Sequence, residues 1–410
     1  MRNSNPLGQG TPFEVFQAFL RLGFTSFGGP VAHLGYFQTE FVERRRWLDA
    51  RSYADLVALC QFLPGPASSQ VGMALGLQRA GWLGALLAWI GFTMPSACLL
   101  IAFAYGILEF SALAVSGAVH GLKVVAMAVV AQAVWGMAKS LCPDRLRAGF
   151  AILAALLALL VPSAAGQIAA LLACGFAGRM LLGGSGEEAT APIASGVSPK
   201  AGVAALAVFL VLLLALPLLA AFWGESANAS QVTDLALPWA PIEGFYRAGA
   251  MVFGGGHVVL PLLQAVVVPD GLVSNAALLA GYGAAQAVPG PLFSFAAYLG
   301  AVMDGPLRGW TGGLFFLVVI FLPAFLLVVG ALPFWDLLRG NRAVRGMMAG
   351  VNAGVVGLLL SALYDPVFVT AIRGSSDLGL ALAAFGLLAF ARVSPVVVVA
   401  LGAAAGWVLG

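Results

Sequence analysis

Charged residues are scarce in this chain. Asp, Glu, Lys and Arg make up 9% of its 410 residues, whereas 61% are hydrophobic. A soluble domain carries about 25% charged residues, so this chain cannot cover a water-facing surface of ordinary size. The uncharged gaps lie at 80–108, 148–178, 201–224, 248–269, 271–303 and 309–335. Each exceeds the roughly 20 residues that a helix needs to cross a bilayer, which predicts an all-α polytopic membrane protein.

Motifs that would indicate other chemistry are also missing. The four cysteines, Cys60, Cys98, Cys142 and Cys174, show no CxxC spacing, so the sequence predicts neither a disulfide framework nor a zinc site. HExxH, P-loop and GxSxG motifs are absent, so we expect no enzyme, ATP-driven pump, metal or cofactor. A net charge of +3 is too small to indicate a nucleic-acid partner.

Hydrophobic runs between helix breakers predict membrane segments, of which we expect about 10–13. They lie at 13–36, 53–77, 82–108, 113–138, 147–162, 166–182, 201–223, 241–264, 276–300, 310–335, 343–363, 376–392 and 394–410. The polar stretches 183–200 and 224–237 are typical of loops outside the membrane. We therefore predict an N-terminal repeat at 11–182, a linker with one extra helix (201–223) at 183–240, and a C-terminal repeat at 241–410.

The two halves share one set of motifs at an offset of 225 to 229 residues. RLGFTSFGGP begins at Arg21 and recurs as RAGAMVFGGG from Arg247, and QFLPGP begins at Gln61 and recurs as QAVPGP from Gln286. Further equivalent positions are Gly81 and Gly309, Pro95 and Pro323, and Gly121 and Gly350. Several motifs in one register indicate an ancestral unit used twice.

The basic residues indicate that the repeats are inverted. The loop 37–52 carries four arginines whereas its counterpart 265–275 carries none, and 336–345 carries three whereas 109–112 carries none. The loop after the fourth segment of the first repeat carries Lys139, Arg145 and Arg147, whereas the equivalent loop of the second repeat carries only Arg373. Basic loops face the cytoplasm, so opposite insertion is favoured over a parallel duplication. If every segment crossed the membrane once, in alternating directions, some basic loops would not face the cytoplasm. We therefore expect broken or re-entrant elements among the segments.

Helix breakers interrupt four apolar segments at equivalent positions. In a membrane, irregular backbone survives where it lines a cavity or is buried in protein. The N–H groups at a new helix N-terminus bind anions, whereas the alternative role of small residues is close helix packing. The symmetry of the breaks favours a binding site. The residues are Phe27, Gly28, Gly29 and Pro30; Phe253, Gly254, Gly255 and Gly256; Pro64, Gly65 and Pro66; and Pro289, Gly290 and Pro291.

Cations within apolar segments are candidate anion ligands. Arg21 and Arg247 are repeat-equivalent, and their planar guanidinium groups suit an oxyanion; the alternative is snorkelling to lipid headgroups. Lys123 has Asn352 as its equivalent, which indicates an asymmetric functional cation. Its alternative is a structural pair with a carboxylate such as Glu109.

Amide and imidazole side chains complete the candidate site. Gln61 and Gln286 are equivalent and could donate to an oxyanion or bond between helices. His33 and His257 follow the Phe-Gly-Gly breaks of the first and second repeats, but they are offset by two positions from repeat equivalence. Either could couple transport to protons, although a structural hydrogen bond is the alternative role.

This combination resembles the chromate ion transporter family. Its marks are Arg-x-Gly-x-x-x-Phe-Gly-Gly, a following Glu-Phe-Val-Glu-Arg-Arg-Arg-Trp stretch at 40–47 and Pro-Gly-Pro, duplicated along nearly the whole chain. One departure is Gly256 at the position equivalent to Pro30. Proline suits the first turn of a helix, so the second repeat indicates a new helix at this point less strongly.

The resemblance implies a secondary transporter of the bacterial inner membrane that exports chromate, confers resistance and uses the proton-motive force. Chromate is a tetrahedral dianion similar to sulfate. Alternatives are therefore a transporter of sulfate or another oxyanion, and a passive anion channel. A membrane scaffold would have no use for symmetric broken helices. The sequence leaves room for a homodimer.

Overall fold

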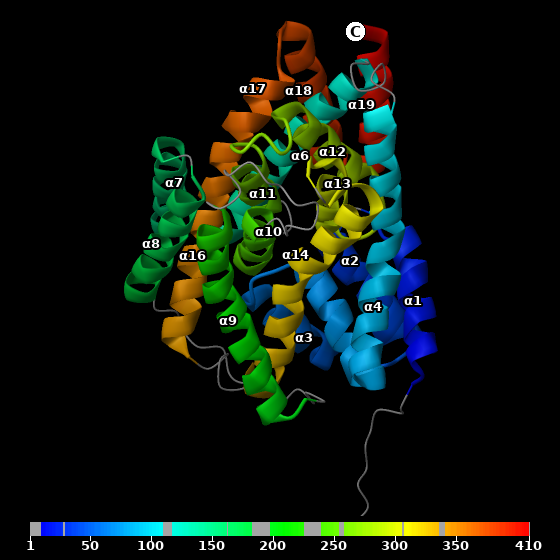
Figure 1. The fold of residues 1–410 in the computed structure, drawn as a ribbon, viewed down its shortest axis with the longest axis vertical. Helices are drawn as coiled ribbons and strands as arrows, with labels where there is room; N and C mark the ends of the chain where they lie inside the picture. Colours follow the sequence, from blue (N-terminus) through cyan, green and yellow to red (C-terminus); the bar gives the residue numbers. More distant parts are fainter. Residues whose placement is uncertain are drawn as a thin grey trace, which may run out of the picture.

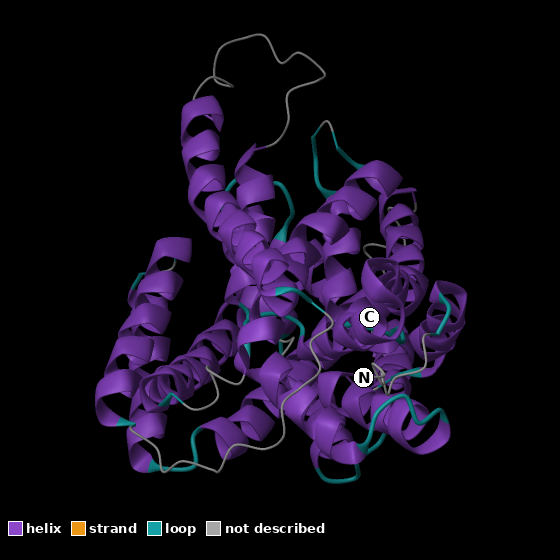
Figure 2. Ribbon diagram, turned by 90° about the horizontal axis from the view of Figure 1, so that it is seen from below, coloured by secondary structure: helices purple, strands orange, loops and turns teal. Residues whose placement is uncertain are grey.

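The computed structural model describes residues 10–27, 29–109, 117–161, 163–182, 197–224, 239–253, 258–305, 307–335 and 341–409, and these contain helices and loops but no strand (Figures 1 and 2). The elements are α1 (Pro12–Thr25), α2 (Gly29–Phe37), η1 (Gln38–Arg44), α3 (Ala50–Phe62), α4 (Ala67–Glu109), α6 (Gly117–Leu141), α7 (Arg145–Leu160), α8 (Ala164–Leu181), α9 (Pro199–Gly224), α10 (Trp239–Met251), α11 (Val259–Val267), α12 (Asn275–Ala287), η4 (Leu292–Ser294), α13 (Phe295–Val302), α14 (Gly309–Ala331), η5 (Leu332–Phe334), α16 (Arg342–Ala362), η6 (Leu363–Phe368), α17 (Val369–Ala371), α18 (Ser375–Ala389) and α19 (Pro395–Leu409).

Five helices among the described residues are long and apolar enough to cross a bilayer, and they lie in α4, α6, α9, α14 and α16. The chain is therefore a multi-pass, all-α membrane protein, as predicted. Every predicted segment coincides with a helix or a pair of helices. Most of the two predicted loops, 183–200 and 224–237, lies outside the described residues.

Four predicted segments are pairs of short helices rather than single spans. They are 13–36 (α1 and α2), 53–77 (α3 and the start of α4), 241–264 (α10 and α11) and 276–300 (α12 and α13). Glycines with positive φ lie at three of these breaks: Gly29 at +79°, Gly65 at +123° and Gly290 at +99°. A residue with a Cβ disfavours this region, so glycine is what lets the chain leave one helix and begin the next. The prediction of broken helices is confirmed.

The 43-residue helix α4 reverses direction near its first third. Its backbone is non-helical at Gly81, where φ is +66°, and Gly76 lies directly against Gly84. In the second repeat, α13 and α14 make the same turn, with Gly300 against Gly312. Each repeat therefore has a helical hairpin at this point, and the backbones touch because neither partner carries a side chain.

Repeat-equivalent helices run in opposite directions where they meet. The second part of α4 lies along α14, with Trp82 against Phe325 (ring centroids 6.2 Å apart). At the other end, the backbone N–H of Trp310 donates to the Tyr105 hydroxyl over 3.3 Å. As residue numbers rise along α4 they fall along α14, so the two helices are antiparallel. Because these helices occupy the same place in the two repeats, the repeats are inverted, as the arginine pattern predicts.

The repeats also exchange their last helices. The hairpin of α18 and α19 packs on α6 of the first repeat, and the hairpin of α7 and α8 packs on α16 of the second, as Figure 1 shows for α7, α8 and α16. Gly121 of α6 lies against Gly402 of α19, and its equivalent Gly350 lies against Cys174 of α8. We name these three-helix groups the α6 bundle and the α16 bundle; their helices α6 and α16 also contact each other, and α1–α4 together with α10–α14 form the central layer.

Candidate functional site

The four breaks are joined in pairs across the two repeats. The backbone N–H of Gly65 donates to the Val252 carbonyl over 2.6 Å, and that of Gly290 donates to the Ser26 carbonyl over 2.9 Å. Gly65 and Gly290 are repeat-equivalent, as are Ser26 and Val252. Each Pro-Gly-Pro element thus donates a hydrogen bond to a carbonyl that the break in the other repeat would leave unpaired. Such pairing is needed because a bilayer offers no water to bond a free backbone carbonyl. These two amides are bonded within the protein.

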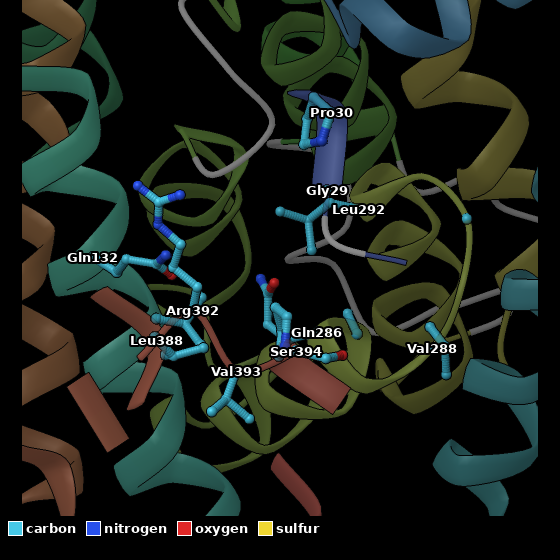
Figure 3. A pocket seen from close by; sticks show the side chains of 14 residues that line it. Gly29, Pro30, Gln132, Gln286, Val288, Leu292, Leu388, Arg392, Val393 and Ser394 are labelled. Atoms are coloured by element: carbon cyan, nitrogen blue, oxygen red, sulfur yellow. The ribbon is translucent and has the colours of Figure 1, made fainter. Parts of the chain in front are cut away.

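A cavity of about 270 Å³ lies beside this junction, between the central layer and the α6 bundle (Figure 3). Its walls come from the start of α2, the end of α12, α6 and the turn between α18 and α19. The lining residues are Gly29, Pro30, Val129, Gln132, Ala285, Gln286, Val288, Gly290, Leu292, Leu388, Arg392, Val393, Ser394 and Pro395. Four residues predicted from the sequence therefore meet here: Gly29, Pro30, Gln286 and Gly290.

The polar lining of the cavity consists of hydrogen-bond donors that suit an anion. Gln286 lies at the centre of the view in Figure 3, with Arg392 and Gln132 beside it. The Nε2 atom of Gln286 is buried and has no hydrogen-bond partner among the described residues. A guanidinium offers five N–H donors, and no acidic side chain is among the described residues that line this cavity. The arrangement can hold a tetrahedral oxyanion by charge-assisted hydrogen bonds.

Arg392 is the charged side chain of this cavity, and the sequence analysis did not single it out. It lies in the short turn between two hydrophobic segments, where a charge is ordinarily a loop marker. Its φ of +53° is uncommon for a residue with a Cβ, and such conformations cluster at binding and active sites. The signal in the sequence was the asymmetry of the repeats, because the equivalent turn at 161–163 carries no cation.

Buried polar side chains surround the first break. His33 is 1% exposed; its Nδ1 lies 3.4 Å from the Ser68 hydroxyl, and its Nε2 has no partner among the described residues. Ser26, Ser68, Thr93 and Ser96 are also buried. The equivalent positions in the second repeat are apolar: Val252, Val259, Phe293, Phe321 and Ala324. The fold is nearly symmetric at this junction, but the second repeat lacks these five polar side chains.

Several predicted ligands do not line this cavity. Arg21 and Gln61 are exposed on α1 and α3. Arg247 forms an ion pair with Glu243 one turn earlier on α10, with Nε and Oε1 3.1 Å apart. Pro64, Gly65, Pro66, Pro289 and Pro291 lie at the breaks but outside the lining, and Phe253 is half-buried. The predicted residues Gly28, Gly254, Gly255, Gly256 and His257 lie outside the described residues.

Lys123 belongs to a separate polar group near the start of α6. It is 7% exposed and lies within the electrostatic reach of Arg373. One turn earlier, His120 meets Asp377 of α18, with Nε2 and Oδ1 2.9 Å apart. Nine residues separate Lys123 from Gln132, which is about 13 Å along the helix axis. Its equivalent Asn352 is half-buried, and the Asn352 Oδ1 has no partner among the described residues.

Comparison with known proteins identifies the family to which the chain belongs. The family model "Chromate transporter" matches residues 13–179 and 239–407. The chromate transport protein of Pseudomonas aeruginosa is 30% identical over 97% of this chain and 92% of its own length. That of Cupriavidus metallidurans is 27% identical over 96% of this chain and 92% of its own length. A probable chromate transport protein of Synechococcus elongatus is 26% identical over 85% and 83%. No solved structure matches the chain.

Proposed function

Because the chain belongs to the chromate transporter family, we propose that it is a secondary transporter that exports chromate across the bacterial inner membrane. Export lowers the internal concentration of a toxic oxidant, so the protein confers chromate resistance. Family membership points to a transporter rather than an enzyme. Chromate itself enters this proposal through the relatives, whose names specify chromate transport.

The observation that carries the proposal is the donor-lined cavity at the junction of the breaks. Its guanidinium from Arg392, the unpartnered amide nitrogen of Gln286 and the first turn of α2 at Gly29 converge on one space. A tetrahedral dianion loses its hydration shell on entering a membrane protein, and fixed N–H donors replace that shell. Sulfate has the same shape and charge, so selection between the two oxyanions depends on the fit of this space.

The position of the cavity suits alternating access. Inverted-repeat transporters move one group of helices against another around a central site. Here the cavity lies between the central layer and the α6 bundle, so a rocking of that bundle would open or close it. Proton-motive force supplies the energy in this proposal, and His33 beside the first break is a candidate proton carrier.

Radiolabelled chromate uptake into inverted membrane vesicles tests the proposal. We expect accumulation that requires an imposed proton gradient and is absent from vesicles without the protein. Competition with sulfate and molybdate then defines the substrate, since equal inhibition by sulfate would favour the broader oxyanion transporter. Flux that follows voltage alone and never exceeds electrochemical equilibrium would contradict coupled transport and favour a passive channel.

A further inference from the structure

A second cavity of about 210 Å³ lies on the other side of the molecule, between the α16 bundle and α11. Its lining residues are Ala158, Leu159, Gln167, Pro261, Gln264, Ala265, Val268, Pro269, Leu358, Ser361, Ala362 and Asp365. Part of this wall is the repeat equivalent of the first cavity. Leu358 and Ser361 of α16 occupy the positions that Val129 and Gln132 occupy on α6.

The charged group of the second cavity has the opposite sign to that of the first. Asp365 is the one charged side chain among the described residues that line it, whereas Arg392 is the one that lines the first cavity. Ser361 and Gln264 also line the cavity, and their side chains carry a hydroxyl and an amide. Oxygen ligands with one negative charge suit a cation and repel a dianion.

Within the part of the chain that the structure describes, the side-chain oxygen of Gln167 has no hydrogen-bond partner that would explain its burial. Its Nε2 donates to the Pro261 carbonyl over 3.4 Å, which orients the amide. The Oε1 atom is then left buried, without a hydrogen-bond partner among the described residues. Leaving a buried acceptor unpaired destabilises the fold, and a bound cation would remove that cost.

The backbone at Asp365 is also unusual. Asp365 lies inside η6 with φ −125° and ψ 117°, because Pro366 follows it and disfavours a helical conformation in the preceding residue. The carboxylate therefore stands at an interruption at the end of α16. Lys123 lies on α6, which packs against η6, and Arg373 follows α17; neither lines the cavity.

We propose that this second cavity binds a small monovalent cation, a sodium ion or a proton carried as hydronium, through Asp365, Gln167, Ser361 and Gln264. The role of this cation as the coupling ion rests on the proposed function above, whereas its binding does not. Anion and cation would then occupy pseudo-symmetric cavities, one against each bundle.

The binding test uses the purified full chain in detergent without chromate. We expect ²²Na⁺ binding by the native protein to fall at least tenfold in Asp365→Asn and to fall in part in Ser361→Ala. Asp304 is exposed, as Asp365 is, but lies outside the cavity, so Asp304→Asn should bind as the native protein does. If Asp365→Asn does not fold, Ser361→Ala and Gln167→Met, judged by their binding per folded protein, decide the question.

Vesicle flux separates the two cations. If sodium does not bind, we expect the pH dependence of chromate flux to flatten in Asp365→Asn and to persist in Asp304→Asn, which identifies the proton as the cation. Sodium binding and pH dependence both unchanged in Asp365→Asn would overturn the proposal. Cation binding that depends on Asp365 in a protein that carries no chromate would refute the proposed function and leave this site standing.

Discussion

The backbone N–H of Gly290 donates a 2.9 Å hydrogen bond to the Ser26 carbonyl, which lies in the other repeat. Gly65 and Val252 form the equivalent bond with donor and acceptor exchanged between repeats. Such reciprocal contacts are the signature of a two-fold relationship. Each repeat needs its partner to satisfy its own broken backbone, so the central layer exists only when both repeats are folded together.

Close backbone contact at the crossing of α10 and α14 predicts a strict requirement for glycine. A Cβ added at Gly249 would collide with the Ile320 carbonyl and the Pro323 ring. At the equivalent position of the first repeat, a Cβ added at Gly23 would collide with the Gly91 carbonyl and the Pro95 ring. We expect Gly249→Val to lose most of its monodisperse peak in fluorescence-detected size-exclusion chromatography.

The matched control for this substitution is Gly386→Val. Gly386 is also helical but faces open space, so both variants carry the same β-branched penalty in a helix. A Gly249→Val protein as monodisperse as Gly386→Val would show that the crossing is looser than the structure indicates.

Removing the cation of the first cavity should weaken substrate binding. We expect Arg392→Asn to raise the KM for chromate at least tenfold, which corresponds to about 1.4 kcal/mol. Asparagine tolerates a positive φ better than most residues, so the turn at +53° survives the change. Arg145→Asn is the control, because Arg145 on α7 is exposed, as Arg392 is, but lies outside the cavity. An unchanged KM in vesicle uptake would exclude Arg392 from the binding site.

Lys123 offers a test of the separate polar group on α6. Lys123→Met is expected to abolish export while leaving the protein in the membrane, because a buried cation is costly to keep and is retained for function. Lys139→Met, on the same helix but exposed, should export normally. Immunoblots of membranes and flux in proteoliposomes measure the two properties. Normal oxyanion flux in Lys123→Met would remove this lysine from the pathway.

Inverted topology predicts opposite exposure of two equivalent loops. Cysteines introduced at Gln38, which is exposed, and at Asn275, in the first turn of α12, should react with a membrane-impermeant maleimide from opposite sides. The native cysteines must first be replaced, since Cys98 is exposed and Cys142 half-exposed. Labelling of both positions from one common side would falsify the inversion.

Stability at low pH should depend on Glu40 in η1. Its Oε1 lies 2.5 Å from Arg45 Nε and its Oε2 lies 2.9 Å from Arg44 Nη1. Burial works to raise the pKa of Glu40, but the hydrogen bonds and charges of Arg45 and Arg44 outweigh it and hold the pKa below its ordinary value. The carboxylate therefore stabilises the fold above the ordinary glutamate pKa, and this contribution is lost as the pH falls through the lowered value.

We expect the apparent Tm of the native protein to fall as the pH is lowered from 6 towards about 4. Glu40→Gln should have a lower Tm at pH 7 and a flatter profile, and Glu43→Gln, an exposed neighbour, should follow the native curve. Parallel profiles for Glu40→Gln and the native protein would show that other groups control acid stability.

Local features of the sequence predicted much of the fold. The breaks at Gly29, Gly65 and Gly290 could be placed because glycine and proline act on their own backbone, whatever surrounds them. The turn inside α4 at Gly81 was anticipated as a segment boundary for the same reason. The site was less predictable, because Arg21 and Arg247 matched a symmetric pattern, whereas the cavity is lined by Arg392 from an exchanged hairpin.

By itself, the sequence determined an all-α membrane protein of two inverted repeats, with breaks at equivalent positions. Hydrophobic segments, basic loops and helix breakers act through their immediate surroundings and the bilayer, so these features could be predicted without knowing any contact between distant residues. Only the tertiary structure decided which amides are bonded, which cation enters the cavity and which bundle holds each hairpin. Those outcomes depend on contacts between residues far apart in the sequence, such as Ser26 with Gly290, which no local pattern encodes.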